Sequence, residues 1–294
     1  MKIKDSFGDR VFMGINLAVV IFLLVIVVYP LILVLSSSVS TPEAVGRGEV
    51  LLLPVGFTLD GYRRVFDEPT VWIGYRNTLF YTFFGTMVNI FLTLPAAYAL
   101  SKRALPGRAF LMGFFLVTMY FSGGMIPAFM LVRALGLIDT RTIMVISGAV
   151  SVYNLIVART FFVNIPKELE EAAYIDGCSI LRGFTQIVLP LSKALLGVMV
   201  LFYAVAHWNS FFTALIYITS EDLRPLQIVL RRILIIDTQA MDMVGGDDIA
   251  QEIEALRQLV RYSIIVVSSV PVLVLYPWLQ KYFEKGVLIG SVKG

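Results

Sequence analysis

Charged residues are scarce in this chain. Only 15% of its 294 residues are charged and 58% are hydrophobic, whereas about 25% are charged in an ordinary soluble domain. The single cysteine, Cys178, excludes an internal disulfide. A net charge of +3 without a basic stripe excludes nucleic acid as a partner. The shortage of charge indicates that lipid contacts much of the surface.

Further absences limit the chemistry of the chain. No Gly-x-x-x-x-Gly-Lys-Ser/Thr loop occurs, so the chain has no phosphate-binding loop for ATP. A zinc protease of the His-Glu-x-x-His type needs two histidines, and His207 is the only one. No Gly-x-Ser-x-Gly sequence of a serine hydrolase accompanies His207. The sequence also lacks a motif for the ring of charged residues that would indicate a channel. We expect no catalytic residue, no metal ion and no cofactor in this chain; an intramembrane enzyme and a channel are kept as alternatives.

Long apolar runs predict an all-α membrane protein with six transmembrane helices. A helix needs about 20 apolar residues to cross the hydrocarbon core. The fourth run reaches that length only if it continues to residue 162, which requires the Arg159 side chain to place its charged group at the membrane interface. The first run is too long for a signal peptide, although Lys2, Lys4 and Arg10 precede it. The runs are Val11–Leu35, Asn77–Leu100, Ala109–Val132, Thr142–Ala158, Ala194–Ser220 and Tyr262–Gln280.

Two connecting segments are long. Residues 36–76 are rich in glycine and proline and are expected to form an irregular loop. Residues 221–261 are expected to be partly helical, with Asp247 or Asp248 as the cap. Such a helix carries one apolar face, which either packs on its own domain or docks an external partner. The face comprises Ile249, Ile253, Leu256 and Val260.

The segment between the fourth and fifth runs predicts two short helices joined by a turn. Pro166 suits the first turn of a helix, and the three acidic residues that follow are favoured by the helix dipole. Gly177 is expected to end this helix in a left-handed conformation. Ser179 is expected to cap a second helix that stops near Pro190.

The same segment, residues 163–190, resembles the EAA loop of binding-protein-dependent ABC importer permeases. Glu171-Ala172-Ala173 is followed after three residues by Gly177, and after nine more by Ile187-x-Leu189-Pro190. Within that family the chain is most similar to carbohydrate permeases for complex oligosaccharides, including uronate-containing fragments of pectin or alginate. It is more distantly similar to the smaller membrane subunit of the maltose importer. Other stretches that carry the resemblance are Tyr75–Leu79, Ala96–Arg103, Met119–Pro127, Leu135–Thr140 and Gly286–Gly294.

The resemblance implies one permease domain over residues 1–294 of a bacterial plasma-membrane protein, with both termini cytoplasmic. Lys and Arg counts in the connecting segments only weakly support this orientation. The resemblance further implies four partners: a second permease chain, a dimeric ATPase subunit that binds ATP and Mg²⁺, an extracytoplasmic sugar-binding protein and the transported oligosaccharide. The EAA segment (163–190) would be a cytoplasmic coupling helix–turn–helix. Its coupling residues would be Glu170, Glu171, Ala172, Ala173, Asp176, Gly177, Ile187, Leu189 and Pro190.

Polar residues deep in a span are candidates for the transport pathway. The fifth run places His207, Trp208 and Asn209 near its middle. A sugar site needs an aromatic surface and hydrogen-bonding groups, but successive helical residues point about 100° apart. His207 is interpreted rather as an interhelical hydrogen-bonding residue. Asn89 in the second run, Trp208 and Asn209 are therefore the pathway candidates.

Overall fold

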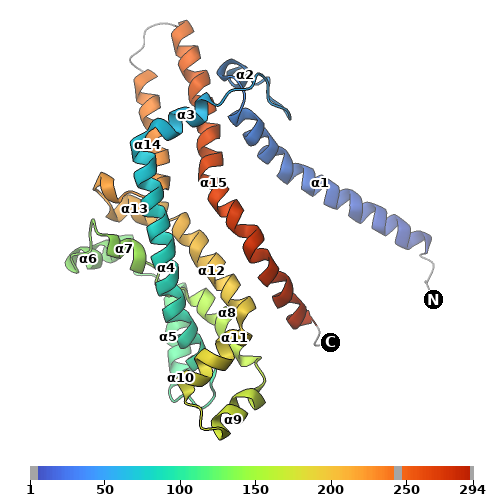
Figure 1. Ribbon diagram of the computed structural model, residues 1–294, viewed down its shortest axis with the longest axis vertical. Coiled ribbons are helices and arrows are strands. Elements are labelled where there is room, and N and C mark those ends of the chain that lie inside the picture. Colours follow the sequence, from blue (N-terminus) through green and yellow to red (C-terminus); the bar gives the residue numbers. More distant parts are fainter. Residues whose placement is uncertain (1–5, 242–246, 292–294) are drawn as a thin grey trace. The chain divides into compact units, whose positions relative to one another are not determined.

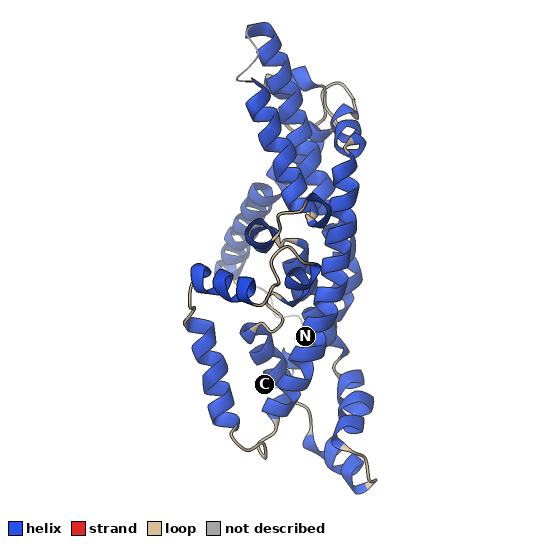
Figure 2. Ribbon diagram, turned by 90° about the vertical axis from the view of Figure 1, so that its left-hand side faces the viewer, coloured by secondary structure: helices blue, strands red, loops and turns tan. Residues whose placement is uncertain are grey.

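The regular elements in the described part of the chain are all helices. The structure is a computed structural model that describes residues 6–241 and 247–291, and this part contains no strand (Figures 1 and 2). Lys2, Lys4 and the last three residues of the expected C-terminal tail lie outside it. The elements are α1 (Phe7–Ser38), α2 (Pro42–Gly46), α3 (Asp60–Asp67), α4 (Pro69–Ser101), α5 (Arg108–Tyr120), α6 (Met125–Ala134), α7 (Arg141–Ile146), α8 (Val152–Val163), α9 (Lys167–Ile175), α10 (Ile180–Gly183), a π-helical turn (Phe184–Val188), α11 (Leu189–Leu191), α12 (Lys193–Trp208), α13 (Phe211–Tyr217), a 3-10 turn (Glu221–Leu223), α14 (Leu226–Met241) and α15 (Asp247–Ser291).

Three described helices are long and apolar enough to cross a membrane. They are α1, α4 and the stretch Ile253–Val274 of α15. Two bent pairs raise the number to five if each pair is one span: α5 with α6, bent by 112°, and Ile180–Leu191 with α12, bent by 84°. α8 is apolar but shorter. The count of six transmembrane helices therefore stays a prediction.

Three of the expected spans are interrupted in the structure. The run 109–132 breaks before Gly124, whose φ of 87° suits only glycine. The run 142–162 breaks between α7 and α8, where Gly148 has a φ of 70°. The run 194–220 breaks between α12 and α13, at Asn209 and Ser210. Hydropathy is continuous through all three breaks, because the residues that cause them are small or uncharged.

The chain folds as two compact units, the first comprising Met1–Pro69 and Leu230–Ser269. Here residues 36–76 are more regular than the irregular loop expected, since they contain α2, α3 and the start of α4. Buried serines at the end of α1 organise them: the Ser36 hydroxyl donates to the Leu52 carbonyl and the Ser40 hydroxyl to the Ser36 carbonyl, each at 2.7 Å. Hydroxyl–carbonyl bonds of this kind satisfy buried backbone groups that water would otherwise solvate.

Helix α15 (Asp247–Ser291) begins at the first described residue after the gap at 242–246, so the expected cap at Asp247 or Asp248 stays a prediction. Its residue Leu259 is fully buried in a small core with Ala44, Val45 and Val50, and Leu256 packs against that core. Of the predicted apolar face, Val260 is buried and Leu256 packs on its own unit, whereas the side chain of Ile249 lies outside the described residues. Docking of an external partner on the segment stays a prediction.

The second unit comprises Thr70–Val229 and Val270–Gly294. Its main core lies where the second half of α4 meets α8, the π-helical turn and α12. Tyr98 lies at its centre, with ring centroids 4.7 Å from Phe184 and 5.8 Å from Phe162. The other buried members are Leu94, Ala97, Leu100, Leu155, Ala158, Val188, Leu195, Met199 and Tyr203. This core holds the EAA segment and α12 against α4.

At the other end of α4, Asp139 closes a loop between α6 and α7. Its carboxylate accepts hydrogen bonds from the backbone N–H groups of Thr219 and Ser220, both at 2.9 Å, and from the Ser220 hydroxyl. These bonds, that of the Ser220 hydroxyl first, hold the pKa of Asp139 below its usual value. Asp139 also has a left-handed backbone, with a φ of 57°, which Asp and Asn tolerate better than most residues.

We expect Asp139→Asn to weaken this closure by about 1 kcal/mol at neutral pH, because a neutral amide accepts weaker hydrogen bonds than a carboxylate. Asn keeps the left-handed backbone, so the change isolates the charge. The wild-type advantage is present above the unfolded-state pKa of about 3.9 and is lost as the pH falls through the lowered folded-state pKa. Hydrogen–deuterium exchange at residues 219 and 220 measures it; equal protection of both proteins at pH 7 would contradict this role.

Candidate functional site

Helix α9 carries the Glu-Ala-Ala sequence and ends at Gly177. The φ of Gly177 is 77°. The N–H groups of Gly177 and Cys178 donate to the carbonyls of Tyr174 (3.0 Å) and Ala173 (2.9 Å), which is the Schellman arrangement of a helix end. The predicted left-handed stop is thus confirmed. A Cβ on Gly177 would meet nothing within 4 Å, so a side chain there would act through backbone strain alone.

The second half of the EAA segment is anchored in the core of the second unit. The Ser179 side chain accepts a hydrogen bond from the Arg182 N–H at 3.4 Å, which confirms the expected cap. Beyond α10 the chain forms the π-helical turn, whose Phe184 and Val188 are buried. α11 contains Pro190 and ends at Leu191, near the predicted stop. The turn at Gly177 thus connects an anchored half to the half that carries α9.

The nine predicted coupling residues divide into two sets. One set is exposed and accessible to a partner, while the other is turned toward the protein and partly or wholly covered. The exposed set is Glu171, Ala172, Asp176, Gly177 and Pro190, and the covered set is Glu170, Ala173, Ile187 and Leu189.

Glu170 is held inside the chain by Lys102. The two side chains form an ion pair and are 14% and 32% exposed. The Lys102 ammonium also lies 4.2 Å from the centroid of the Tyr98 ring, a cation–π geometry. Lys102 and Tyr98 belong to the stretch Ala96–Arg103, so the geometry gives that stretch a role the sequence alone did not: it ties α9 to the end of α4.

The outer surface of the EAA segment is unusually apolar for a loop. Ile175 is 87% exposed, and Ile180 and Leu181 are 67% and 72% exposed. They lie on both sides of the Gly177 turn in the sequence, and Glu171 and Ala172 of the same segment are also exposed. Clustered apolar side chains outside a helix bundle mark contact sites.

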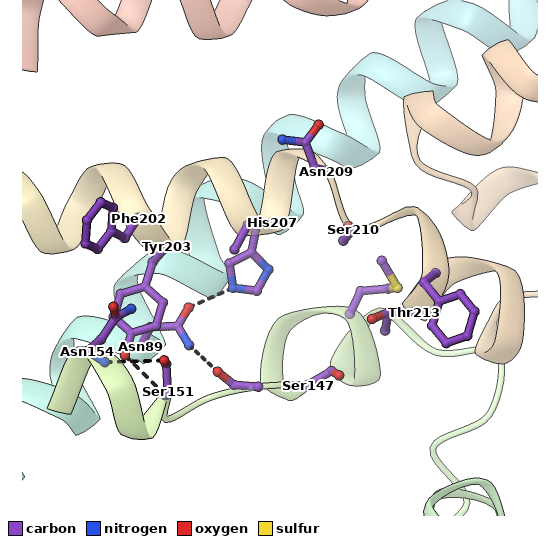
Figure 3. Close-up of a pocket in the computed structure, with 14 residues that line it drawn as sticks. Asn89, Ser147, Ser151, Asn154, Phe202, Tyr203, His207, Asn209, Ser210 and Thr213 are labelled. Atoms are coloured by element: carbon purple, nitrogen blue, oxygen red, sulfur yellow. Dashed lines mark hydrogen bonds between the residues drawn. The ribbon is translucent and has the colours of Figure 1, made fainter. Parts of the chain in front are cut away.

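A cavity of about 390 Å³ lies in the second unit, lined by α4, α12, α13 and the break between α7 and α8 (Figure 3). Its wall is uncharged. It combines aromatic surface with hydroxyl and amide groups, the composition of a site for a polar, uncharged group. The lining includes Asn89, Ser147, Ser151, Asn154, Phe202, Tyr203, His207, Asn209 and Thr213.

The side chain of Asn89 organises this cavity. Its amide nitrogen donates to the carbonyls of Gly148 and Ala149, both at 2.9 Å, and its oxygen lies 2.7 Å from His207 Nε2. The two carbonyls belong to the break between α7 and α8, which leaves them without helical partners. Asn89 therefore stabilises the break and joins three segments. The interhelical hydrogen bond expected of His207 is present between α12 and α4.

Gly85 makes room for the His207 ring. A Cβ on Gly85 would overlap the imidazole, so only glycine allows α4 and the ring to approach this closely. On the same side of the cavity, the Tyr203 hydroxyl lies 2.7 Å from the Thr93 hydroxyl and accepts from the Ser151 N–H at 3.3 Å. The wall is thus pre-formed by hydrogen bonds within the chain.

The three pathway candidates differ in their positions. Asn89 and Asn209 line the cavity; the Asn209 amide donates to the Val205 carbonyl of its own helix at 3.0 Å. Trp208 lies outside it, with 3% exposure and a ring centroid 6.3 Å from that of Tyr75.

Sequence reasoning missed Tyr203, Ser147, Ser151 and Asn154 as members of the wall. The signal that could have found them was Gly148 between serines, since it marks a break in the fourth run. That break exposes polar side chains that a continuous helix would have distributed around its circumference.

Known proteins are similar to this chain over most of its length. Residues 70–289 match the family described as "Binding-protein-dependent transport system inner membrane component". Two relatives in Bacillus subtilis are similar over most of their length. Protein LplC is 40% identical over 92% of this chain and 90% of its own. The polygalacturonan/rhamnogalacturonan transport system permease protein YtcP is 42% identical over 92% and 93%.

A solved structure is similar over nearly the whole chain. It belongs to a bacterial ABC transporter involved in the import of the acidic polysaccharide alginate. The two chains are 34% identical and superpose with a TM-score of 0.85, which covers 96% of this chain and 100% of the other. The family resemblance inferred from the EAA segment is confirmed: the chain belongs to the family of inner-membrane components of binding-protein-dependent transport systems.

Proposed function

We propose that this chain is one membrane-spanning subunit of an ATP-driven importer that passes a uronate-containing oligosaccharide from an extracytoplasmic binding protein into the cytoplasm. The observation that carries the proposal is the EAA segment. Its Glu171 and Ala172 are exposed beside a left-handed glycine stop and an apolar surface, within a chain of this family. The substrate class rests on the names of the relatives, which transport polygalacturonan, rhamnogalacturonan or alginate.

The proposal requires other subunits. Because the sequence lacks a phosphate-binding loop, ATP and Mg²⁺ bind in a separate dimeric ATPase that receives α9. A second permease chain forms the other half of the pathway, and a binding protein delivers the sugar. In a bacterial plasma membrane, α9 and both termini face the cytoplasm.

The contacts within the chain suggest how movement reaches the cavity. Lys102 and Glu170 fasten α9 to the end of α4, and Asn89 lies about 18 Å further along that helix at 1.5 Å per residue. A displacement of α9 by the ATPase therefore moves the helix whose Asn89 supports the cavity wall. Rigid-body motion of this kind is the usual basis of alternating access.

Topology is tested by single cysteines in a Cys178→Ser background. We expect Ala104→Cys and Ile175→Cys to resist an impermeant thiol reagent added outside intact cells, and Leu53→Cys to react, because the first two lie at the end of the protein assigned to the cytoplasm. Permeabilised cells provide the control in which Ala104→Cys becomes labelled. Labelling of Ala104→Cys in intact cells would reverse the orientation.

Coupling is tested by Glu171→Lys and Gly177→Val in the complete complex. Both variants should insert normally but lose most sugar-stimulated ATP hydrolysis. The first reverses a charge on the exposed face, and the second strains the left-handed turn by about 1 kcal/mol or more. Membrane insertion and ATP hydrolysis are measured in parallel on reconstituted complexes. Wild-type stimulation in both variants would remove the coupling role, and absence of sugar-stimulated hydrolysis in the wild type would favour the enzyme or channel alternatives.

The link between α9 and α4 is tested by exchanging its charges. Lys102→Glu and Glu170→Lys should each reduce stimulated ATP hydrolysis, and their combination should recover much of it because the ion pair is restored. Lys102→Glu combined with Glu168→Lys is the matched control, since Glu168 is exposed on the same helix and is not one of the nine coupling residues. Equal recovery in both double variants would show that net charge, rather than this contact, matters.

A further inference from the structure

His207 has one ring nitrogen engaged and one unengaged. Its side chain is more than nine-tenths buried, and it is the only histidine of the chain. Nε2 lies 2.7 Å from the oxygen of Asn89, whereas the described residues offer no hydrogen-bond partner to Nδ1. Figure 3 shows this second nitrogen on the side of the ring facing away from Asn89, toward Ser210 and the open part of the cavity.

The contacts of Asn89 determine which ring nitrogen carries the proton. Its amide group donates to two backbone carbonyls, so its oxygen is on the other side and can only accept. Nε2 of His207 must therefore be the donor. Apart from His207 itself, no lining residue of the cavity is acidic or basic, so no charged neighbour in the lining stabilises an imidazolium. The ring is neutral, and Nδ1 presents an unshared electron pair.

The ring is also held in place. Gly85 leaves a space that the imidazole fills, so α4 confines the ring on one face. The bond to Asn89 fixes its rotation. Nδ1 is open to the cavity, because it is not among the buried polar atoms that lack a partner. An acceptor held in this way cannot turn away from a ligand that enters the cavity. The hydroxyl of Ser210, three residues further along the chain, is buried and lacks a hydrogen-bond partner among the described residues.

We infer that His207 Nδ1 accepts a hydrogen bond from a hydroxyl of the transported sugar, and that this cavity recognises uncharged sugar hydroxyls, not carboxylates. The inference deepens the proposed function and rests on it. A neutral acceptor attracts an O–H group and repels a carboxylate, and the lining offers no cation to offset that repulsion. Phe202 and Phe212 provide apolar surface for the ring of the sugar. The carboxylates of a uronate substrate are therefore bound elsewhere in the importer.

Two substitutions separate the two ring nitrogens. His207→Gln places an amide near the position of Nε2, so it keeps a donor for Asn89 and removes the acceptor at Nδ1. His207→Asn places an amide oxygen near the position of Nδ1, so it keeps the acceptor and removes the donor. A purely structural His207 would tolerate Gln better than Asn, whereas a sugar-binding His207 requires the opposite for affinity.

The experiment measures the dissociation constants of trigalacturonic acid and of its carboxyl-reduced, uncharged form. The purified complete importer is used without its binding protein, so that only the membrane site is observed. We expect His207→Gln to raise both constants about fivefold, the effect of one neutral hydrogen bond. His207→Asn should recover most of that loss while lowering the melting temperature of the complex.

A spectroscopic measurement examines the ring itself. With ¹⁵N-histidine in this chain, the only histidine signal should show a protonated Nε2 and an unprotonated Nδ1, and either sugar should shift the Nδ1 resonance. A protonated Nδ1 in the free complex would overturn the inference.

The binding results also decide it. Unchanged constants in His207→Gln, or an equal loss in His207→Asn, would reduce His207 to a structural role while leaving the proposed transport function intact. A loss confined to the charged sugar would overturn the preference for hydroxyls. A wild-type complex that neither binds these sugars nor hydrolyses ATP faster with any oligosaccharide and its binding protein would overturn the proposed function together with the inference.

Discussion

The buried amide of Asn89 is the contact on which the second unit depends. It joins α4 to the break between α7 and α8 and to His207 of α12. Each partner needs it: two carbonyls in a non-helical stretch have no other described donor, and the imidazole needs an acceptor for its proton. A buried polar group with all its bonds made is stabilising, whereas the same group with one bond lost costs about 1–3 kcal/mol. This network stabilises the non-helical stretch between α7 and α8, and that stretch forms part of the cavity wall.

Helix α4 connects the two candidate sites. Its last turns carry Tyr98, and Lys102 directly follows the helix. Lys102 lies over the Tyr98 ring and holds α9 through its ion pair with Glu170. Its middle carries Gly85 and Asn89, which confine His207. The arrangement has an ion pair at one end and a glycine against a ring at the other. Motion of α9 is therefore expected to reach the cavity along the backbone of one helix, α4, which contains Pro95 between the two contacts.

The charge distribution separates two kinds of recognition. The surface of the EAA segment combines exposed acids with exposed isoleucine and leucine. This combination suits a soluble partner that covers the apolar side chains and carries positive charge opposite the acids. The cavity lining contains hydroxyl, amide, imidazole and aromatic groups without charge. In a low-dielectric region a lone charge would be costly to bury, and a charge in the pathway would also hold an oppositely charged substrate too tightly to release it. An uncharged wall is compatible with transport because each of its hydrogen bonds is weak and replaceable.

The sequence by itself determined the family and the local form of the EAA segment. The stop at Gly177 and the cap at Ser179 depend on neighbouring residues alone, so their spacing was enough to predict them. Tertiary structure decided which side chains face one another. Glu170 and Glu171 are adjacent in sequence, yet one is paired with Lys102 and the other exposed, because the way α9 packs on α4 assigns each face. Hydropathy could not locate the breaks near Gly124, Gly148 and Asn209, since apolar runs continue through them. The partnership of Asn89 with His207, 118 positions apart, arises only when α4, α8 and α12 pack together, which no local pattern encodes.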